Sequence, residues 1–422
     1  MRHEKHLPLI KSFFSVGALR FASIPLGLLI NILLARILGP ANYGNYSFLV
    51  SLTLLASSPA LGIRQFIIRE VATLHSGKNE DALKGFYKFL NIWAITFSVL
   101  VIFLLWSFNQ ASVIANIDGN FLFISLLLTF SYLNYIRLSY LTGLQKPFIS
   151  NFFEQVSQPL IFIAGISASF LFLASSVNLS LFIKSISILA SVIGLSYIIN
   201  KYHLNNLKST SYQIKKWLYS MPPFFVITFF VTLNAEIATF ILGFLGKSED
   251  IAGLQIAQKI AVLIGVGMLI VNSVIGPKIV DFNISNKKQL QKLLQSSAKF
   301  SSLLAIPLAF LFILFGEEII AILFGEEYVL LSYYPMLLLV LSQLLYVSFG
   351  SNVFLLNMTN HQNDTLKVSI ITCLVTFTLC LFLIPSIGNI GAAVSIFISN
   401  ITACLIYAYI IFKRFNFRIT VI

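Results

Sequence analysis

Charged residues are scarce in this chain, and their scarcity excludes a water-soluble globule. They make up 10% of the 422 residues, whereas about a quarter of the residues in a soluble domain are charged. Hydrophobic residues make up 58%, which also excludes an intrinsically disordered chain, since disorder requires low hydrophobicity and high charge. The mean hydropathy of +0.89 indicates instead an integral membrane protein.

Residues that build cross-links, metal sites or catalytic centres are also few. The three cysteines lie inside apolar runs, and Cys373 and Cys380 fall on one predicted helix, which argues against a disulfide framework. The five histidines lack metal-ligand spacing. No pair of carboxylates and no nucleophile with a base stands out. We therefore predict no metal, no cofactor and no enzymatic activity.

Apolar runs separated by polar breaks predict an all-α membrane protein with twelve transmembrane helices, at about 20 apolar residues per crossing. The first run is too long for a cleaved signal peptide and is interpreted as the first membrane helix. The ninth run is short, and residues 317–328 after it are expected to form an interfacial helix. The predicted spans are residues 12–38, 44–62, 86–108, 121–143, 156–175, 178–200, 220–246, 255–276, 300–316, 329–352, 366–386 and 390–412.

Basic residues set the predicted orientation of these spans. The chain carries 28 Lys and Arg against 15 Asp and Glu, a net charge of +13. The charges sit in short loops between apolar runs, which argues for membrane lipids and against nucleic acid as a partner. With the N-terminus inside, roughly 20 Lys and Arg lie in inner segments, and only Lys247 lies in an outer loop. We therefore expect both termini to be cytoplasmic.

The two halves of the chain resemble each other. Residues 38–44 are similar to residues 245–253 with two residues inserted, and spans two and eight are each followed by a basic inner segment. Six helices per half would make both halves point the same way, as in a parallel repeat about an axis along the membrane normal. We expect an N-terminal six-helix bundle (1–200), a cytoplasmic linker (201–219) and a C-terminal six-helix bundle (220–422) around a central cavity. The alternative is chance similarity between two sets of six apolar runs.

Arg20 is a candidate substrate ligand in the first predicted span. It lies about 12 Å inside the span at 1.5 Å per residue, and a charge at the centre of a bilayer costs at least ~2.5–3.5 kcal/mol. Four small or polar residues share its helical face: Gly17, Ser23, Gly27 and Asn31. We interpret this stripe as a cavity lining on which Arg20 binds an anion. The alternative is that the small residues pack helices and Arg20 extends to the membrane surface.

Glu236 is the only acid within the predicted spans. It lies about 15 Å from the outer end of span seven, near the midplane of a ~30 Å hydrocarbon core. Thr232 and Thr239 share its face. We predict that these residues line the cavity and that the carboxylate binds a proton or a cation that drives transport. The alternatives are a structural ion pair and a permanently protonated acid.

Further cations give the predicted cavity a positive charge. Gln255 and Lys259 share a face at the outer end of span eight, and Arg137 lies in the inner part of span four. For both cations, extension to the membrane surface is the alternative. If they face the cavity with Arg20, cations outnumber Glu236, and such a cavity favours an anionic substrate such as a phosphate-bearing head group.

Five short segments carry a family resemblance. They are residues 34–46, which include LARILGP and YGNY, residues 62–72, GLQK at 143–146, LFGEEY at 323–328 and residues 384–393. In this order, and over nearly the whole chain, they resemble Wzx-type polysaccharide flippases of the multidrug/oligosaccharidyl-lipid/polysaccharide exporter superfamily.

The resemblance implies two six-helix bundles around a cationic cavity, with Arg20 in contact with the substrate. It implies a flippase that moves an undecaprenyl-pyrophosphate-linked oligosaccharide, such as an O-antigen repeat unit of lipopolysaccharide, from the inner to the outer leaflet of the bacterial inner membrane by alternating access. It also implies partners in the polysaccharide polymerase and chain-length machinery.

Two other functions are open to a chain of this composition. A drug/cation antiporter of the same superfamily would need acids in its cavity, and span one carries none. A membrane polysaccharide polymerase would need a sizeable outer loop with catalytic residues, and every predicted outer loop is short.

Overall fold

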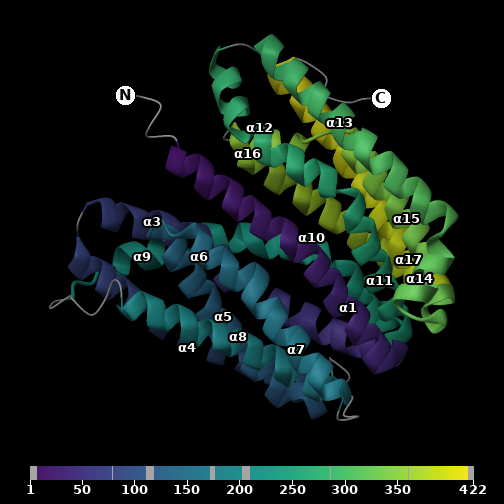
Figure 1. Cartoon of the computed structure of the whole chain (residues 1–422), viewed down its shortest axis with the longest axis horizontal. Coiled ribbons are helices and arrows are strands. Elements are labelled where there is room, and N and C mark those ends of the chain that lie inside the picture. The colour runs from purple at the N-terminus through teal and green to yellow at the C-terminus, as the bar shows by residue number, and fades with distance from the viewer. Residues whose placement is uncertain are drawn as a thin grey trace. The chain divides into compact units, whose positions relative to one another are not determined.

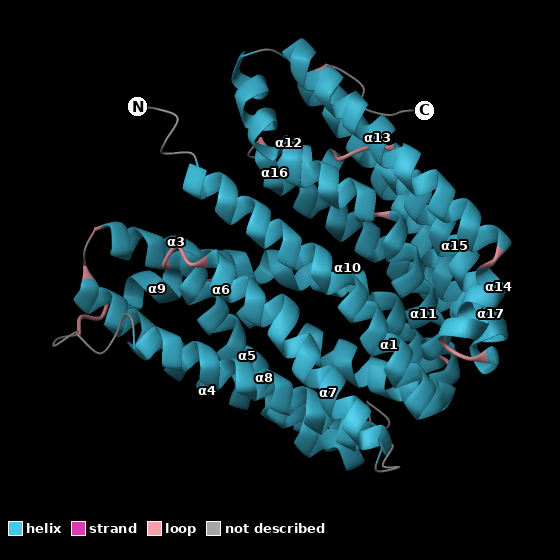
Figure 2. Cartoon of the chain, viewed as in Figure 1, coloured by secondary structure: helices cyan, strands magenta, loops and turns pink. Residues whose placement is uncertain are grey.

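The structure, a computed structural model, describes residues 7–77, 79–110, 118–171, 176–201, 210–285, 287–359 and 361–416. All regular elements in these ranges are helices, and no strand occurs among them (Figure 2). A chain this apolar must satisfy its backbone polar groups internally within a bilayer, and helices do so inside each segment. The predicted all-α fold is confirmed. The chain forms two compact units, each with its own core.

Unit 1 comprises residues 1–38 and 49–232. Helix α5 lies at its centre and packs against α3, α4, α6 and α8 (Figure 1). The helices that contribute to this unit are α1 (Leu7–Ala56, except residues 39–48), α2 (Ser58–Gly62), α3 (Arg64–Ser76), α4 (Glu80–Gln110), η1 (Asp118–Asn120), α5 (Phe121–Gly143), α6 (Pro147–Phe152), the π-helix η2 (Phe153–Ser157), α7 (Gln158–Leu171), α8 (Val177–Ile199), α9 (Ile214–Ser220) and the beginning of α10 (Pro222–Leu245).

Unit 2 comprises residues 39–48 and 233–422. Helix α15 packs against α11, α13 and α17. The segment predicted to follow the ninth span as an interfacial helix forms α14 and η4. Besides residues 39–48 of α1 and the end of α10, the unit contains α11 (Ser248–Ile264), α12 (Val266–Ser285), α13 (Lys287–Leu314), α14 (Gly316–Leu323), η4 (Glu326–Tyr328), α15 (Val329–Ser348), α16 (Asn352–Met358) and α17 (Gln362–Phe415).

Glycines break two long helical runs at positions where the sequence predicts the end of a span. Gly39 (φ 71°) divides α1, and Gly388 (φ 56°) divides α17. Both backbones are left-handed, which costs a residue with a side chain more than it costs glycine. Gly44, just past the first break, packs against α11 so closely that a Cβ atom would lie 1.7 Å from the Ser248 carbonyl oxygen.

The described helices are consistent with twelve spans. Eight of them are long and apolar enough to cross a membrane. Of these, α1 and α17 each contain two arms, α11 and the start of α12 form an apolar pair bent by 45°, and α7 is a shorter apolar helix. The compact units differ in extent from the predicted bundles 1–200 and 220–422, which remain a prediction. Residues 202–209 of the predicted linker lie outside the described residues.

Candidate transport site

The predicted ligand of span one lies on the first arm of α1, in unit 1. The Arg20 side chain is exposed, and its guanidinium makes no hydrogen bond or ion pair with the described residues. Ser23 Oγ donates to the carbonyl oxygen of Arg20 (2.7 Å), and Asn31 Nδ2 donates to that of Gly27 (2.6 Å). The two polar neighbours therefore bond to their own helix, and the Arg20 guanidinium is a charged donor that is open to a ligand.

Open space borders this arm of α1 at Gly17 and Gly27 in the described structure. Apart from the helix's own nearby backbone, no described atom lies within 4 Å of the position that a Cβ atom would take at Gly17 or Gly27. The apolar side chains of Phe21 and Leu29 are exposed as well, at 56% and 42%. The predicted polar stripe is thus accessible, and so are apolar parts of the same helix.

The predicted residues of unit 2 divide into a packed pair and a charged pair. Thr239 is fully buried, and its Oγ1 accepts a hydrogen bond from Gln255 Nε2 (3.1 Å), which joins α10 to α11. Glu236, one turn before Thr239, is half-buried, and Lys259 is exposed. The two opposite charges lie within electrostatic range of each other. Thr232, at the end of unit 1 on the same helix, is half-buried.

Arg137 is held inside unit 1. The residue is 9% exposed, its Nε donates to Ser196 Oγ on α8 (2.6 Å), and its Nη1 donates to the Leu133 carbonyl oxygen (2.9 Å). Nearby, Ser191 Oγ donates to Asn134 Oδ1 (3.1 Å). The bonds to Ser196 and between Ser191 and Asn134 join α5 to α8, so Arg137 is a buried packing residue in this structure and does not extend to an exposed surface.

An ion pair that the sequence did not indicate joins α3 to the π-helix of unit 1. Arg64 Nη1 and Nη2 donate to the two carboxylate oxygens of Glu154 (2.7 and 2.6 Å). Burial disfavours the charged guanidinium, but the hydrogen bonds and charge of Glu154 outweigh that effect and raise the pKa of Arg64. The predicted fifth span begins at residue 156, whereas the helical run begins at Pro147. Proline at a first helical position is the signal that could have placed Glu154 within this run.

Glu70 is a second acid whose role the sequence did not indicate. It joins the linker helix α9 to α3 through hydrogen bonds. Glu70 is buried, and its Oε1 accepts from Lys216 Nζ (2.7 Å) and from Trp217 Nε1 (3.2 Å). Trp217 is fully buried, with its ring 4.8 Å from that of Phe86. The carboxylate therefore satisfies the polar end of an otherwise apolar anchor.

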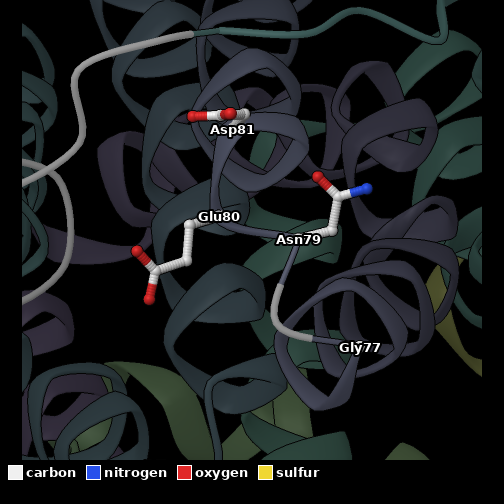
Figure 3. Close-up of a pocket in the computed structure, with 4 residues that line it drawn as sticks. All are labelled: Gly77, Asn79, Glu80 and Asp81. Atoms are coloured by element: carbon white, nitrogen blue, oxygen red, sulfur yellow. The ribbon is translucent and has the colours of Figure 1, made fainter.

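Figure 3 shows an open pocket in unit 1, at the turn between α3 and α4. Its volume is about 470 Å³, and Gly77, Asn79, Glu80 and Asp81 line it. The side chains of Glu80 and Asp81 point in different directions in the close-up. This turn lies outside the predicted spans. Among the described residues, no group of three or more His, Cys, Asp or Glu is arranged to hold a metal ion.

Comparison with known protein families identifies the family of this chain. A family model described as polysaccharide biosynthesis protein matches residues 9–283. The chain belongs to this family. A search of curated proteins finds no match to this chain.

Several solved transporter structures share the fold of this chain. The lipid II flippase MurJ, in an inward closed conformation, is similar over 94% of this chain and 87% of its own, with 17% identity and a TM-score of 0.77. An inward-facing multidrug resistance MATE family transporter of the MOP superfamily is similar over 93% of this chain and 94% of its own, with 13% identity and a TM-score of 0.77. A MOP superfamily transporter from Pyrococcus furiosus, whose binding pocket is described as having reverse polarity, is similar over 96% of both chains, with 13% identity and a TM-score of 0.68.

These likenesses confirm the expected fold. They also agree with the apolar helices of the described residues in identifying a multi-pass membrane protein.

Proposed function

We propose that this protein is a flippase that moves an undecaprenyl-pyrophosphate-linked oligosaccharide from the inner to the outer leaflet of the bacterial inner membrane by alternating access. Family membership supports a role in polysaccharide synthesis, and the fold shared with a lipid II flippase supports a lipid-linked substrate. On this proposal, both termini are cytoplasmic, and polymerase and chain-length proteins take over the product.

The open guanidinium of Arg20 is the observation that carries this proposal. An arginine fork matches the oxygens of a phosphate group and binds them through charge-assisted hydrogen bonds. Arg20 is exposed on an arm of α1 that borders open space, and no described side chain competes for it. It therefore contacts the pyrophosphate, while the sugars follow the polar side chains of α1 and α10 and the polyprenyl chain stays in lipid.

The membrane potential favours the proposed direction. A head group with a charge of about −2 that leaves a negative interior gains ~4–5 kcal/mol at 100 mV if it crosses the whole field. Glu236, half-buried and within electrostatic range of Lys259, adds coupling to a proton or a sodium ion. Both charges belong to unit 2.

A deletion strain tests the proposal. Radiolabelled lipid-linked repeat units are expected to accumulate on the inner leaflet, and the wild-type gene is expected to restore surface polysaccharide. A cation exporter would instead change the sensitivity of the strain to cationic drugs. A polymerase mutant would still display single repeat units on the surface. Either of these outcomes, without inner-leaflet accumulation, contradicts a flippase.

A further inference from the structure

The Arg64–Glu154 pair differs from other ion pairs of the chain in how its two partners are exposed. In the Lys216–Glu70 pair, the side chain of the acid is 6% exposed and that of the cation 53%. In the Arg414–Asp364 pair of unit 2, the values are 10% and 46%. In both pairs the acid is buried and its cation is exposed to solvent. Arg64 and Glu154 are exposed to similar extents, 27% and 21%, so a ligand can reach both members of the pair.

Neither member of this pair is locked in place by a second group. Glu70 also accepts a hydrogen bond from the buried Trp217. Glu154 has no hydrogen-bond donor other than Arg64 among the described residues, and Arg64 donates to no other described acceptor. An anion that takes the guanidinium therefore has to displace a single carboxylate.

The released carboxylate has a candidate second partner in the same helical run. Gln158 lies four residues after Glu154, across the π-helix η2, and such positions share a helical face. Its Nε2 is buried and donates to no acceptor in the described part of the chain. Burying an unused amide donor is costly, and Glu154 would satisfy it after leaving Arg64.

On the predicted topology, Arg64 lies where a lipid head group would arrive at the membrane surface. It is the first residue of α3, directly after the predicted second span, whose inner end is residue 62. The bidentate geometry that Glu154 occupies is the geometry in which arginine binds phosphate. Tyr135 of α5 lies within electrostatic range of both charges and offers a hydroxyl group.

We propose that Arg64 binds the diphosphate of the lipid-linked substrate at the inner membrane surface and that Glu154 occupies this guanidinium until the substrate displaces it. The inference rests on the proposed function and adds a second phosphate-binding position to it. Glu154 acts as an internal competitor that keeps Arg64 ordered and charged without a ligand, and transfer of the carboxylate to Gln158 completes the exchange.

Binding of undecaprenyl pyrophosphate to the purified full-length protein in detergent tests the inference. Glu154→Gln removes the competing charge and is expected to tighten binding about tenfold, while Arg64→Gln weakens it about tenfold, since charge-assisted bidentate contacts are strong. Arg64→Gln with Glu154→Gln should bind like Arg64→Gln alone. The matched control is Glu70→Gln, which removes an acid on α3, the helix of Arg64, that bonds to Lys216 and Trp217 and should leave the affinity within about twofold.

Unchanged or weaker binding by folded Glu154→Gln would overturn the proposal, as would wild-type affinity in Arg64→Gln. If Glu154→Gln does not fold, Arg64→Lys decides, because lysine keeps the ion pair but cannot bind two oxygens as a fork. Its affinity should fall about threefold or more, and wild-type affinity would contradict the inference.

Inorganic pyrophosphate distinguishes a lipid head group from a free phosphate. Weak competition by inorganic pyrophosphate supports the lipid-linked substrate, whereas competition at equal affinity overturns that assignment. Because binding is measured directly, failure of this inference remains separate from failure of the flippase proposal. If the flippase proposal alone fails, the deletion strain accumulates no glycolipid, although the Arg64 and Glu154 variants change the binding affinity as expected.

Discussion

Two arginines of unit 1 show why depth in the membrane is not enough to identify a ligand-binding cation. The sequence places Arg20 and Arg137 inside predicted spans and gives both the same alternatives. In the structure, Arg137 is buried and donates to Ser196 and to the Leu133 carbonyl oxygen. Arg20 is exposed and donates to no described residue. Arg137 donates to α8 and to its own helix, whereas the donors of Arg20 remain open to a substrate.

The largest expected effect is that of Arg20→Ala. If Arg20 binds the pyrophosphate, its loss removes charge-assisted hydrogen bonds of about 1.5–3 kcal/mol, which corresponds to roughly a 10- to 100-fold loss of transport. Surface polysaccharide in the complemented deletion strain and flipping in proteoliposomes measure this loss. Immunoblots of the membrane fraction should show normal protein levels. Normal polysaccharide in this variant would remove Arg20 from the site and erase the contrast with Arg137.

Glu236→Gln extends the comparison to unit 2, where a half-buried charge lies one turn from a fully buried hydroxyl. Glu236 remains accessible, while Thr239 is engaged by Gln255. If the carboxylate carries the coupling ion, we expect flipping in proteoliposomes to fall by about tenfold and to lose its dependence on the ion gradient, since a neutral amide takes up no proton and lacks the negative charge that holds a cation. Thr239→Val is the control and should lower stability more than transport. Normal ion dependence in Glu236→Gln would refute the coupling role.

Arg137→Ala tests the other member of the comparison, the arginine whose guanidinium is buried and hydrogen-bonded. Its two hydrogen bonds and the packing of its side chain are lost, while the cost of burying the charge is relieved, so we expect a net destabilisation of about 2 kcal/mol. That amounts to a drop in Tm of several degrees for a unit of about 200 residues. Transport per folded molecule should stay within about twofold of the wild type. Unchanged Tm with lost transport would instead make Arg137 a substrate ligand.

The sequence predicted the helices of this fold well because apolar runs in a bilayer satisfy their own backbone, and their limits follow from local composition. The break at Gly39 could also be predicted from local sequence, since a left-handed turn favours glycine. Partners across helices could not be predicted. Ser196 lies 59 residues from Arg137, and Glu154 lies 90 residues from Arg64. A helical face gives the direction of a side chain but not the helix that it meets.

Ser196→Ala is expected to give the smallest effect, and it tests the hydrogen bond that holds Arg137 against α8. Ser196 Oγ accepts from Arg137 Nε and donates to the Val192 carbonyl oxygen of its own helix (2.5 Å). Its loss leaves a buried guanidinium donor unsatisfied, which costs about 1–2 kcal/mol. Ser185→Ala on the same helix is the matched control, because among the described residues the buried Ser185 side chain bonds only to the Leu181 carbonyl oxygen of its own helix.

Thermal unfolding of Ser196→Ala, Arg137→Ala and the double variant closes the cycle. We expect the double variant to be less destabilised than the sum of the single variants by about 1 kcal/mol, because Ser196 matters to stability chiefly while Arg137 is present. Strict additivity would mean that the 2.6 Å contact contributes nothing. The burial of Arg137 would then need another cause, and the reason for setting it apart from Arg20 would be lost.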